Sequence, residues 1–239
     1  MLIGIIGSNG YLGETLFRDL SQKGHQLKEI DFQYFDDMYH FSKQLDLLID
    51  CGFPRDIRKK KISNRYLLQL EQRLLVSKKI GIKYLYVGSL SEDSKSNSAY
   101  GRVKADSADL VKKHGGCVIR SGLVVDNKKP GGRYKELLQV YKLMPIKIIP
   151  NERFFPLGVT LLEDFLFATN EIVSKPDIFE PEVLCKIQWT TLRHLLQTLP
   201  NPIDINLSFG ITKFLCILIN TLPLGKFDNL KSIAKQIAK

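Results

Sequence analysis

The stretch Met1-Leu-Ile-Gly-Ile-Ile-Gly-Ser-Asn-Gly-Tyr-Leu-Gly-Glu14 decides the fold of this 239-residue chain. Its apolar run at residues 2–6 is rich in β-branched side chains, which is typical of a buried strand in a parallel sheet. Gly7, Gly10 and Gly13 follow at a spacing of three residues, and a helical pattern of leucines begins among them. The stretch therefore predicts a strand, a glycine turn and a helix in direct succession.

A unit of this kind suits a bound dinucleotide. Gly7 would permit the tight turn, Gly10 the close approach of the backbone to a pyrophosphate, and Gly13 the packing of helix on strand. Asp31 follows a second predicted strand, residues 25–30, and can accept hydrogen bonds from the ribose hydroxyls. Its carboxylate would repel the extra phosphate of NADP, so we expect NAD. A purely structural glycine turn is the alternative. The residues expected to bind the cofactor are Gly7, Ser8, Asn9, Gly10, Tyr11, Leu12, Gly13, Asp31, Cys51, Gly52, Tyr100 and Lys104.

Strand and helix patterns alternate through the first part of the chain. Further strands are expected at residues 32–37, 46–52, 83–88 and 117–125, the last of them bent at Gly122. Helices are expected before residue 45, up to residue 79, and at residues 100–114. This alternation predicts an α/β fold with a Rossmann-type, doubly wound parallel sheet. We assign residues 1–128 to an NAD-binding Rossmann domain.

The pattern changes after residue 128. We expect residues 129–239 to form a small C-terminal substrate-binding region, parts of which return to the main sheet. The elements predicted there are helices at residues 134–143, 161–174 and 189–196, a strand at 146–149, an irregular segment at 151–158, and a weakly amphipathic basic helix from residue 229.

Composition excludes several classes of protein. With 44% hydrophobic residues the chain can bury one substantial core. The first strand begins at Met1, so we expect no signal peptide, and the apolar run at residues 214–219 is too short to span a bilayer. Four scattered cysteines, without a Cys-x-x-Cys pair, favour a reduced cytoplasmic location and no structural metal.

The formal charge of +10 is compatible with several kinds of binding partner. No nucleic-acid-binding motif accompanies the charge, so we expect no nucleic-acid partner. A dinucleotide, a nucleotide-linked substrate and an inner membrane leaflet are all anionic, and solvated lysines explain the charge equally well. The basic cluster at residues 55–61 is likewise either a solvated face or a patch that faces phosphate. Peripheral membrane contact and a homodimer stay open.

Three residues form a candidate catalytic set. Tyr100 and Lys104 lie four residues apart, on one face of a predicted helix. A tyrosine is a weak base at neutral pH, and a nearby ammonium group favours its phenolate. Ser89 leaves the carboxyl end of a predicted strand, the edge where open α/β sheets bind ligands, and its hydroxyl can hold a substrate oxygen. The alternative for Tyr100 and Lys104 is an exposed helical pair.

The same Tyr-x-x-x-Lys spacing occurs once more, at Tyr39 and Lys43. That pair follows no strand that ends in serine, so we discount it. The order of glycine turn, Ser89 and helix is what distinguishes Tyr100.

With these motifs the chain resembles an extended short-chain dehydrogenase/reductase of the NAD-dependent epimerase/dehydratase family. The resemblance covers about the first 175 residues. It implies that Tyr100 is the general acid/base, that Lys104 assists it and bonds the nicotinamide ribose, and that Ser89 orients the substrate. It further implies that the substrate is a nucleotide-activated sugar bound by the C-terminal region. The matching pieces are Gly7-x-x-Gly10-x-x-Gly13, Asp31, residues 46–49, Asn64, residues 86–89, Tyr100-x-x-x-Lys104, residues 118–120 and residues 159–164.

Departures from the family pattern leave the substrate open. Leu90-Ser91 stands where sugar 4,6-dehydratases carry an Asp-Glu pair, which argues against dehydration. Ser89 and Tyr100 are only eleven residues apart, fewer than is common in sugar epimerases. Either epimerisation or reduction of a sugar carbon is therefore expected. A non-catalytic dinucleotide sensor or scaffold, or a reductase of a small carbonyl compound, is the alternative.

Two segments can cover the substrate edge of the sheet. Residues 125–134 contain Arg133, and residues 151–158 contain Arg153 beside two phenylalanines. Arginine forks suit a diphosphate and aromatic faces suit a planar base, so we expect Ser89, Arg133 and Arg153 to bind substrate. A solvated basic loop and a core-packing Phe pair are the alternative.

Overall fold

The computed structural model divides the chain into two compact units. Unit 1 comprises Met1–Gly122 and Thr160–Lys186, and unit 2 comprises Leu123–Val159 and Ile187–Lys239. The assignment of residues 129–239 to substrate binding stays a prediction. The structure describes residues 1–30, 45–54, 56–92, 94–95, 98–143, 157–175, 179–191 and 194–195.

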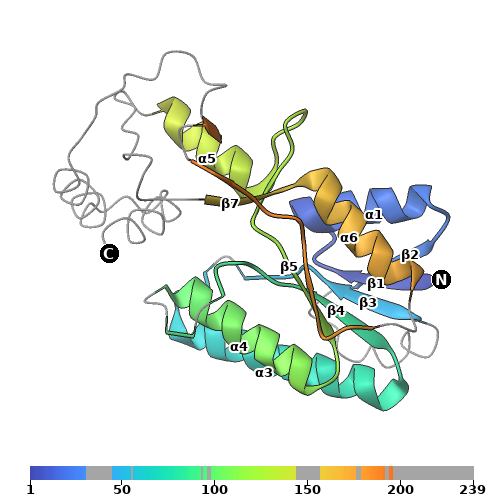
Figure 1. Cartoon of the computed structure of the whole chain (residues 1–239). Coiled ribbons are helices and arrows are strands. Elements are labelled where there is room, and N and C mark those ends of the chain that lie inside the picture. Colours follow the sequence, from blue (N-terminus) through green and yellow to red (C-terminus); the bar gives the residue numbers. More distant parts are fainter. Residues whose placement is uncertain are drawn as a thin grey trace. The chain divides into compact units, whose positions relative to one another are not determined.

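Within the described residues, unit 1 contains a six-stranded sheet in which every pairing is parallel (Figure 1). The strand order is β2-β1-β3-β4-β5-β8. The side chains of Ile3, Ile5 and Ile6 in β1 are fully buried, as expected of a strand covered on both faces. The predicted α/β fold with a Rossmann-type sheet is confirmed. The strands are β1 (Leu2–Ile6), β2 (Gln26–Ile30), β3 (Leu47–Asp50), β4 (Lys83–Val87), β5 (Cys117–Arg120) and β8 (Glu182–Leu184).

Helices cover both faces of this sheet. In Figure 1, α3 and α4 lie side by side on one face, and α1 and α6 lie on the other. Leu70 and Leu74 of α3 pack with Ala108 and Val111 of α4 and with the strands in one buried cluster. Burial of these apolar stripes fixes the helices against the sheet. The bounds are α1 (Tyr11–Gln22), α3 (Lys60–Ile80), α4 (Ala99–Lys113) and α6 (Leu162–Ser174).

Unit 2 holds a smaller sheet with strand order β6-β7-β9. Val125, Tyr134 and Val159 form its buried cluster. β7 and β9 pair antiparallel, with Gly158 opposite Trp189. The elements are β6 (Leu123–Val125), α5 (Gly132–Leu143), β7 (Leu157–Leu161) and β9 (Gln188–Thr190).

Two predicted elements are wrong in part. Residues 117–125 form two strands in two sheets, because after Arg120 the Gly122 N–H donates to Thr160 Oγ1 at 2.9 Å. Residues 188–190 form β9, so the helix predicted at 189–196 cannot begin at Trp189. The His194 N–H donates to Thr191 Oγ1 at 3.3 Å and residues 194–195 are helical, so the capping signal is at Thr191. The strand β8 was not predicted.

Several expected elements lie outside the described residues. They are the strand at 32–37 and the helix that follows it, the strand at 146–149, most of the irregular segment at 151–158, and the basic helix from residue 229. Among the helices that the structure does describe, none combines the length and the hydropathy needed to cross a membrane. The same described ranges contain no group of three His, Cys, Asp or Glu side chains placed to hold a metal ion.

Candidate active site

The glycine turn between β1 and α1 has the geometry that the sequence predicts. Gly7 adopts φ +75°, a left-handed conformation that glycine tolerates without strain. A Cβ on Gly13 would lie 2.2 Å from the Gly7 carbonyl oxygen, so only glycine allows α1 to start this close to the turn. Gly10 occupies the N-cap of α1 without a side-chain cap bond. No side chain at the cap therefore competes for the first-turn amides, which point toward phosphate in sites of this kind.

The end of β3 lies directly against this turn. A Cβ on Gly7 would be 2.8 Å from the Gly52 nitrogen and 3.1 Å from the Cys51 carbonyl carbon. The structure thus brings Cys51 and Gly52 together with the glycine turn. Gly7 and Gly13 are thus packed against backbone with no room for a side chain, the tight strand–turn–helix packing that a dinucleotide-binding turn requires.

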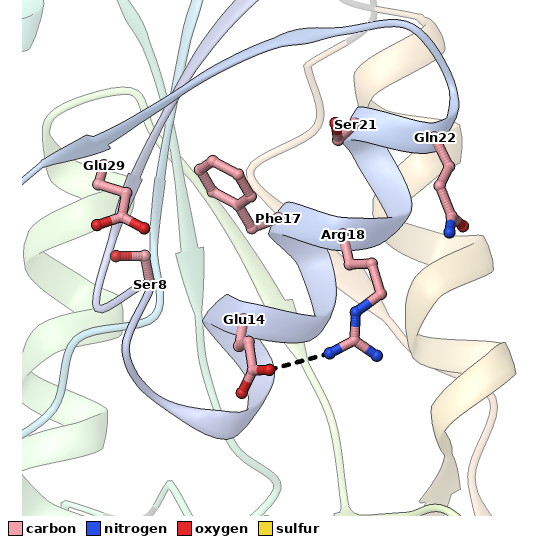
Figure 2. Close-up of a pocket in the computed structure, with 7 residues that line it drawn as sticks. All are labelled: Ser8, Glu14, Phe17, Arg18, Ser21, Gln22 and Glu29. Atoms are coloured by element: carbon pink, nitrogen blue, oxygen red, sulfur yellow. Dashed lines mark hydrogen bonds and ion pairs between the residues drawn. The ribbon is translucent and has the colours of Figure 1, made fainter.

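A pocket with a cavity volume of about 380 Å³ opens between the turn, α1 and β2. Figure 2 shows Ser8 and Glu29 on the strand side, and Glu14 and Arg18 on α1. Glu14 Oε1 pairs with Arg18 Nη2 at 2.9 Å, and both side chains are more than half exposed. Arg18 neutralises Glu14, so the carboxylate of Glu29 leaves the lining with one net negative charge.

Lys104 is anchored at the carboxyl end of β4. Its Nζ donates to the Val87 carbonyl oxygen at 2.7 Å, two residues before Ser89. The Lys104 side chain is buried, and its ammonium lies 4.5 Å from the centre of the Tyr86 ring. Because Tyr100 is one turn earlier on α4, this bond fixes the Tyr100–Lys104 face of the helix at the strand end that carries Ser89.

Phe53 joins Tyr100 and Lys104, and the sequence did not single it out. Its ring packs edge to face on Tyr100 with centroids 5.1 Å apart, and on Tyr66 at 5.2 Å. Lys104 Nζ lies 4.5 Å from its centroid, which is a cation–π distance. Phe53, which follows β3 in the chain, therefore packs against both candidate catalytic side chains. The residues that line a second pocket of about 260 Å³ beside it are Gly52, Phe53, Pro54, Ile62, Arg65, Tyr66 and Gln69.

Glu92 is a second residue that the sequence missed. The polar run at residues 91–98 predicts a surface loop, yet the Glu92 side chain is only 2% exposed. Its Oε1 accepts from the Ser89 N–H at 2.7 Å, and its Oε2 accepts from Arg120 Nε at 2.7 Å. Burial raises the pKa of this carboxyl above its ordinary value, although the Ser89 amide, Arg120 and Lys104 act in the opposite direction.

A second buried carboxylate supports the cofactor side. Asp50, at the end of β3, is fully buried and pairs with Arg73 Nη2 of α3 at 3.0 Å. The Tyr84 hydroxyl donates to Asp50 Oδ2, and the Gly52 N–H donates to Asp50 Oδ1 at 2.9 Å. Because the Gly52 N–H is held by Asp50, this network fixes the backbone that faces Gly7.

The described cysteines do not suit nucleophilic chemistry. Burial, with a contribution from Asp50, raises the pKa of the Cys51 thiol far above its ordinary value. Burial also raises the pKa of Cys117 and of Cys185 to about 12. Their thiols are therefore protonated at neutral pH, and Cys51 contributes backbone and bulk to the site.

The remaining predicted residues are placed as follows. Ser8 is buried beside the turn, Asn9 is exposed, and Tyr11 and Leu12 begin α1. Arg133 is exposed in the first turn of α5, in unit 2. Asp31 and Arg153 lie outside the described residues. The roles of all these residues stay predictions.

The fold is the one found in solved short-chain dehydrogenases/reductases, and at the level of the fold the predicted resemblance is confirmed. A dTDP-4-dehydrorhamnose reductase from Bacillus anthracis, in complex with NADP, superposes with a TM-score of 0.65 at 13% identity, over 82% of this chain and 79% of that one. A short-chain dehydrogenase/reductase superfamily protein from Agrobacterium tumefaciens, with bound NAD, gives 0.63 at 15% identity over 82% and 81%.

A third similar structure carries both a cofactor and a sugar nucleotide. MoeE5 in complex with UDP-glucose and NAD gives a TM-score of 0.65 at 14% identity, over 82% of this chain and 79% of that chain. No protein-family model and no curated protein matches the sequence. At these identities the likeness concerns the fold.

Proposed function

We propose that this protein is a nicotinamide-dinucleotide-dependent oxidoreductase or epimerase that acts on a nucleotide-activated sugar. The observation that carries the proposal is the bond from Lys104 Nζ to the Val87 carbonyl, at 2.7 Å. It supports a site in which Tyr100 and Lys104 work beside Ser89, at the sheet edge where ligands of this fold bind. The close backbone packing at Gly7 and Gly13 supports the cofactor half of the proposal.

The side chains divide the proton chemistry between them. When bound, the nicotinamide ring supplies the acceptor or donor of a hydride from the sugar carbon. Tyr100 takes the proton of the sugar hydroxyl during oxidation and returns it during reduction, and the Lys104 cation favours its phenolate. Ser89 Oγ already accepts from the Ser91 N–H at 3.1 Å, so its own proton is suited to donation to the substrate oxygen.

We further propose NAD as the preferred cofactor. Asp31 would accept from both ribose hydroxyls, and its charge would repel a 2′-phosphate. The Glu29 carboxylate in the pocket lining supports the same preference. Titration of the protein with both dinucleotides tests this choice, and tighter binding of NADP would contradict it.

The sugar nucleotide is proposed on similar grounds. MoeE5, which shares the fold, was crystallised with UDP-glucose and NAD. In this chain the cations proposed to meet a diphosphate are Arg133 and Arg153, and Ser89 would hold the reacting oxygen.

A panel of UDP- and dTDP-sugars, each with NAD or NADH, tests the function. Reduced nicotinamide absorbance reports net oxidation or reduction, and proton NMR of the sugar reports epimerisation. Tyr100→Phe should lower turnover by about 10²-fold or more while NAD affinity changes little, because only the proton transfer is lost. Tyr39→Phe, in the second and discounted Tyr-x-x-x-Lys pair, is the matched control.

The outcomes separate the alternatives. If Tyr100→Phe turns over normally, the assignment of the base is wrong. If only small carbonyl compounds react, the protein is a reductase of that class. If NAD binds and nothing reacts, the sensor or scaffold alternative replaces the proposal.

A further inference from the structure

Ser89 lies in a short loop that closes on itself after β4. The Ser89 N–H donates to Glu92 Oε1 at 2.7 Å, and the Glu92 N–H donates to the Ser89 carbonyl at 3.2 Å. The Ser91 N–H donates to Ser89 Oγ at 3.1 Å. Glu92 thus holds Ser89 by side chain and main chain, and Ser91 occupies one acceptor position of the hydroxyl.

The Glu92 carboxylate occupies space that a side chain at position 88 would need. A Cβ on Gly88 would lie 2.4 Å from Glu92 Oε1 and 2.8 Å from Val118 Cγ1. The other oxygen, Oε2, accepts from Arg120 Nε at 2.7 Å. Both oxygens have charge-assisted or short partners, which suits a fixed acceptor better than a proton donor.

We propose that Glu92 is a positioning residue that fixes Ser89 so that its hydroxyl presents a proton to the substrate oxygen. The inference rests on the proposed function, in which Ser89 holds that oxygen. An ionised carboxylate accepts from the Ser89 amide and from Arg120 together. A protonated acid or a glutamine can satisfy only one of these two donors, so loss of the charge should release the loop.

Glu92 is therefore expected to impose a pH dependence on Ser89. Among the described residues, the charged side chains that act on it are Arg120 of β5 and Lys104 of α4. Both favour the carboxylate, whereas burial favours the acid and raises the pKa above the ordinary value. Glu92 should thus take up its proton at a higher pH than an exposed glutamate does.

The first test needs no substrate. In ¹H–¹⁵N NMR spectra of the full chain, the Ser89 amide proton should lie downfield, because it donates to a carboxylate. Its shift should follow one titration whose midpoint lies above that of an exposed glutamate. Glu92→Gln should move this resonance upfield and abolish the titration. Glu163→Gln, which removes an exposed carboxylate from α6, should change neither.

The second test reads the reaction. With the sugar nucleotide that the panel identifies, Glu92→Gln should lower kcat by about 10²-fold, the scale of a misplaced catalytic group, with little change in KM. The contribution of Glu92 to the acid limb of the kcat profile should disappear together with the carboxylate, and the contribution of Tyr100 should stay. Glu92→Asp should restore part of kcat and an acid limb. A role confined to stability would lower the Tm and leave the pH profile of the folded fraction unchanged.

Gly88 supplies a geometric cross-check. Gly88→Ala should reproduce the Ser89 shift change of Glu92→Gln, because the new methyl group displaces Oε1. In the Glu92→Ala background the same change should have a smaller effect on the Tm, since the 2.4 Å contact is gone.

The proposal is overturned if the Ser89 amide does not titrate, or if Glu92→Gln keeps both the amide shift and kcat. If the wild-type protein turns over no substrate, the proposed function fails. The NMR titration then decides by itself whether Glu92 holds Ser89.

Discussion

Two strands, β3 and β4, each end beside a buried carboxylate, and these carboxylates have different surroundings. Asp50 is fully buried, and its partner Arg73 is 2% exposed. Glu92 is equally buried, but its partner Arg120 is 28% exposed and also bonds Glu182, which is 33% exposed. The buried Asp50–Arg73 pair holds the Gly52 backbone that packs against the glycine turn at Gly7. The Glu92–Arg120 pair has access to solvent and can therefore respond to pH and to a ligand. We expect the part of the site that follows β4 to change its interactions more readily than the part that follows β3.

The largest expected effect breaks the buried Asp50–Arg73 pair. Arg73→Met should lower the free energy of unfolding by about 3–5 kcal/mol, because Asp50 keeps a buried charge without its cation. Urea denaturation measures this, with Arg65→Met as the control, an exposed arginine on the same helix. A loss similar to that of the control would show that water reaches Asp50 and that the two carboxylates do not differ in this way.

An intermediate effect is expected at Phe53, which connects the two regions. Phe53→Leu keeps an apolar side chain and removes both edge-to-face contacts, with Tyr66 and Tyr100. Two such pairs at 0.5–1.5 kcal/mol each predict a loss of about 1–3 kcal/mol in unfolding free energy. Phe167→Leu, at an exposed position of α6, is the control. Equal losses in the two variants would remove Phe53 as a link between the regions.

The smallest effect is expected on the solvated side. Glu182→Gln removes the outer partner of Arg120, whose Nη1 lies 2.8 Å from Glu182 Oε1, and also the partner of Lys112. Because these groups are about one third exposed, the loss should be about 1 kcal/mol or less and should shrink in high salt. Thermal unfolding at two salt concentrations measures it. A loss of stability as large as that of Arg73→Met would show that the ion pairs of Arg120 and of Arg73 contribute equally to stability.

The cofactor side of the site was predictable because its geometry is local. Gly7, Gly10 and Gly13 restrict their own turn within seven residues, and a Cβ on Gly13 would approach Gly7 to 2.2 Å. The buried apolar run of β1 then requires that α1 pack against this strand directly after the turn. The spacing of Tyr100 and Lys104 was predictable for the same reason, since it is set by one helix.

The substrate side of the site, around Ser89 and Glu92, depends on contacts between residues that are distant in the sequence. Glu92 lies in a polar loop, and its burial follows from Arg120, 28 residues later, which no local pattern encodes. The strand break after Arg120 depends on Thr160, 38 residues beyond Gly122. Phe53 carries no signal in the local sequence, because its partner Tyr100 comes from another element.

The C-terminal error has a local cause. Thr191 supplies a genuine capping signal, and the expected helix was extended back over Trp189 and Thr190. Those residues instead pair with β7, and Trp189 is 69% exposed on β9.

The anchored ends of the segment between Glu92 and Ser98 have a practical consequence for labelling. Glu92 is bonded to Ser89 and Arg120, and Ser98 Oγ accepts from the Gly101 N–H at 3.4 Å as the cap of α4. Residues inserted between these two anchors need not disturb either, because doubling the length of a connecting segment costs only about 0.6 kcal/mol in closure entropy. A peptide tag or a cysteine for a fluorophore inserted there would report on ligand arrival beside Ser89 without occupying the site.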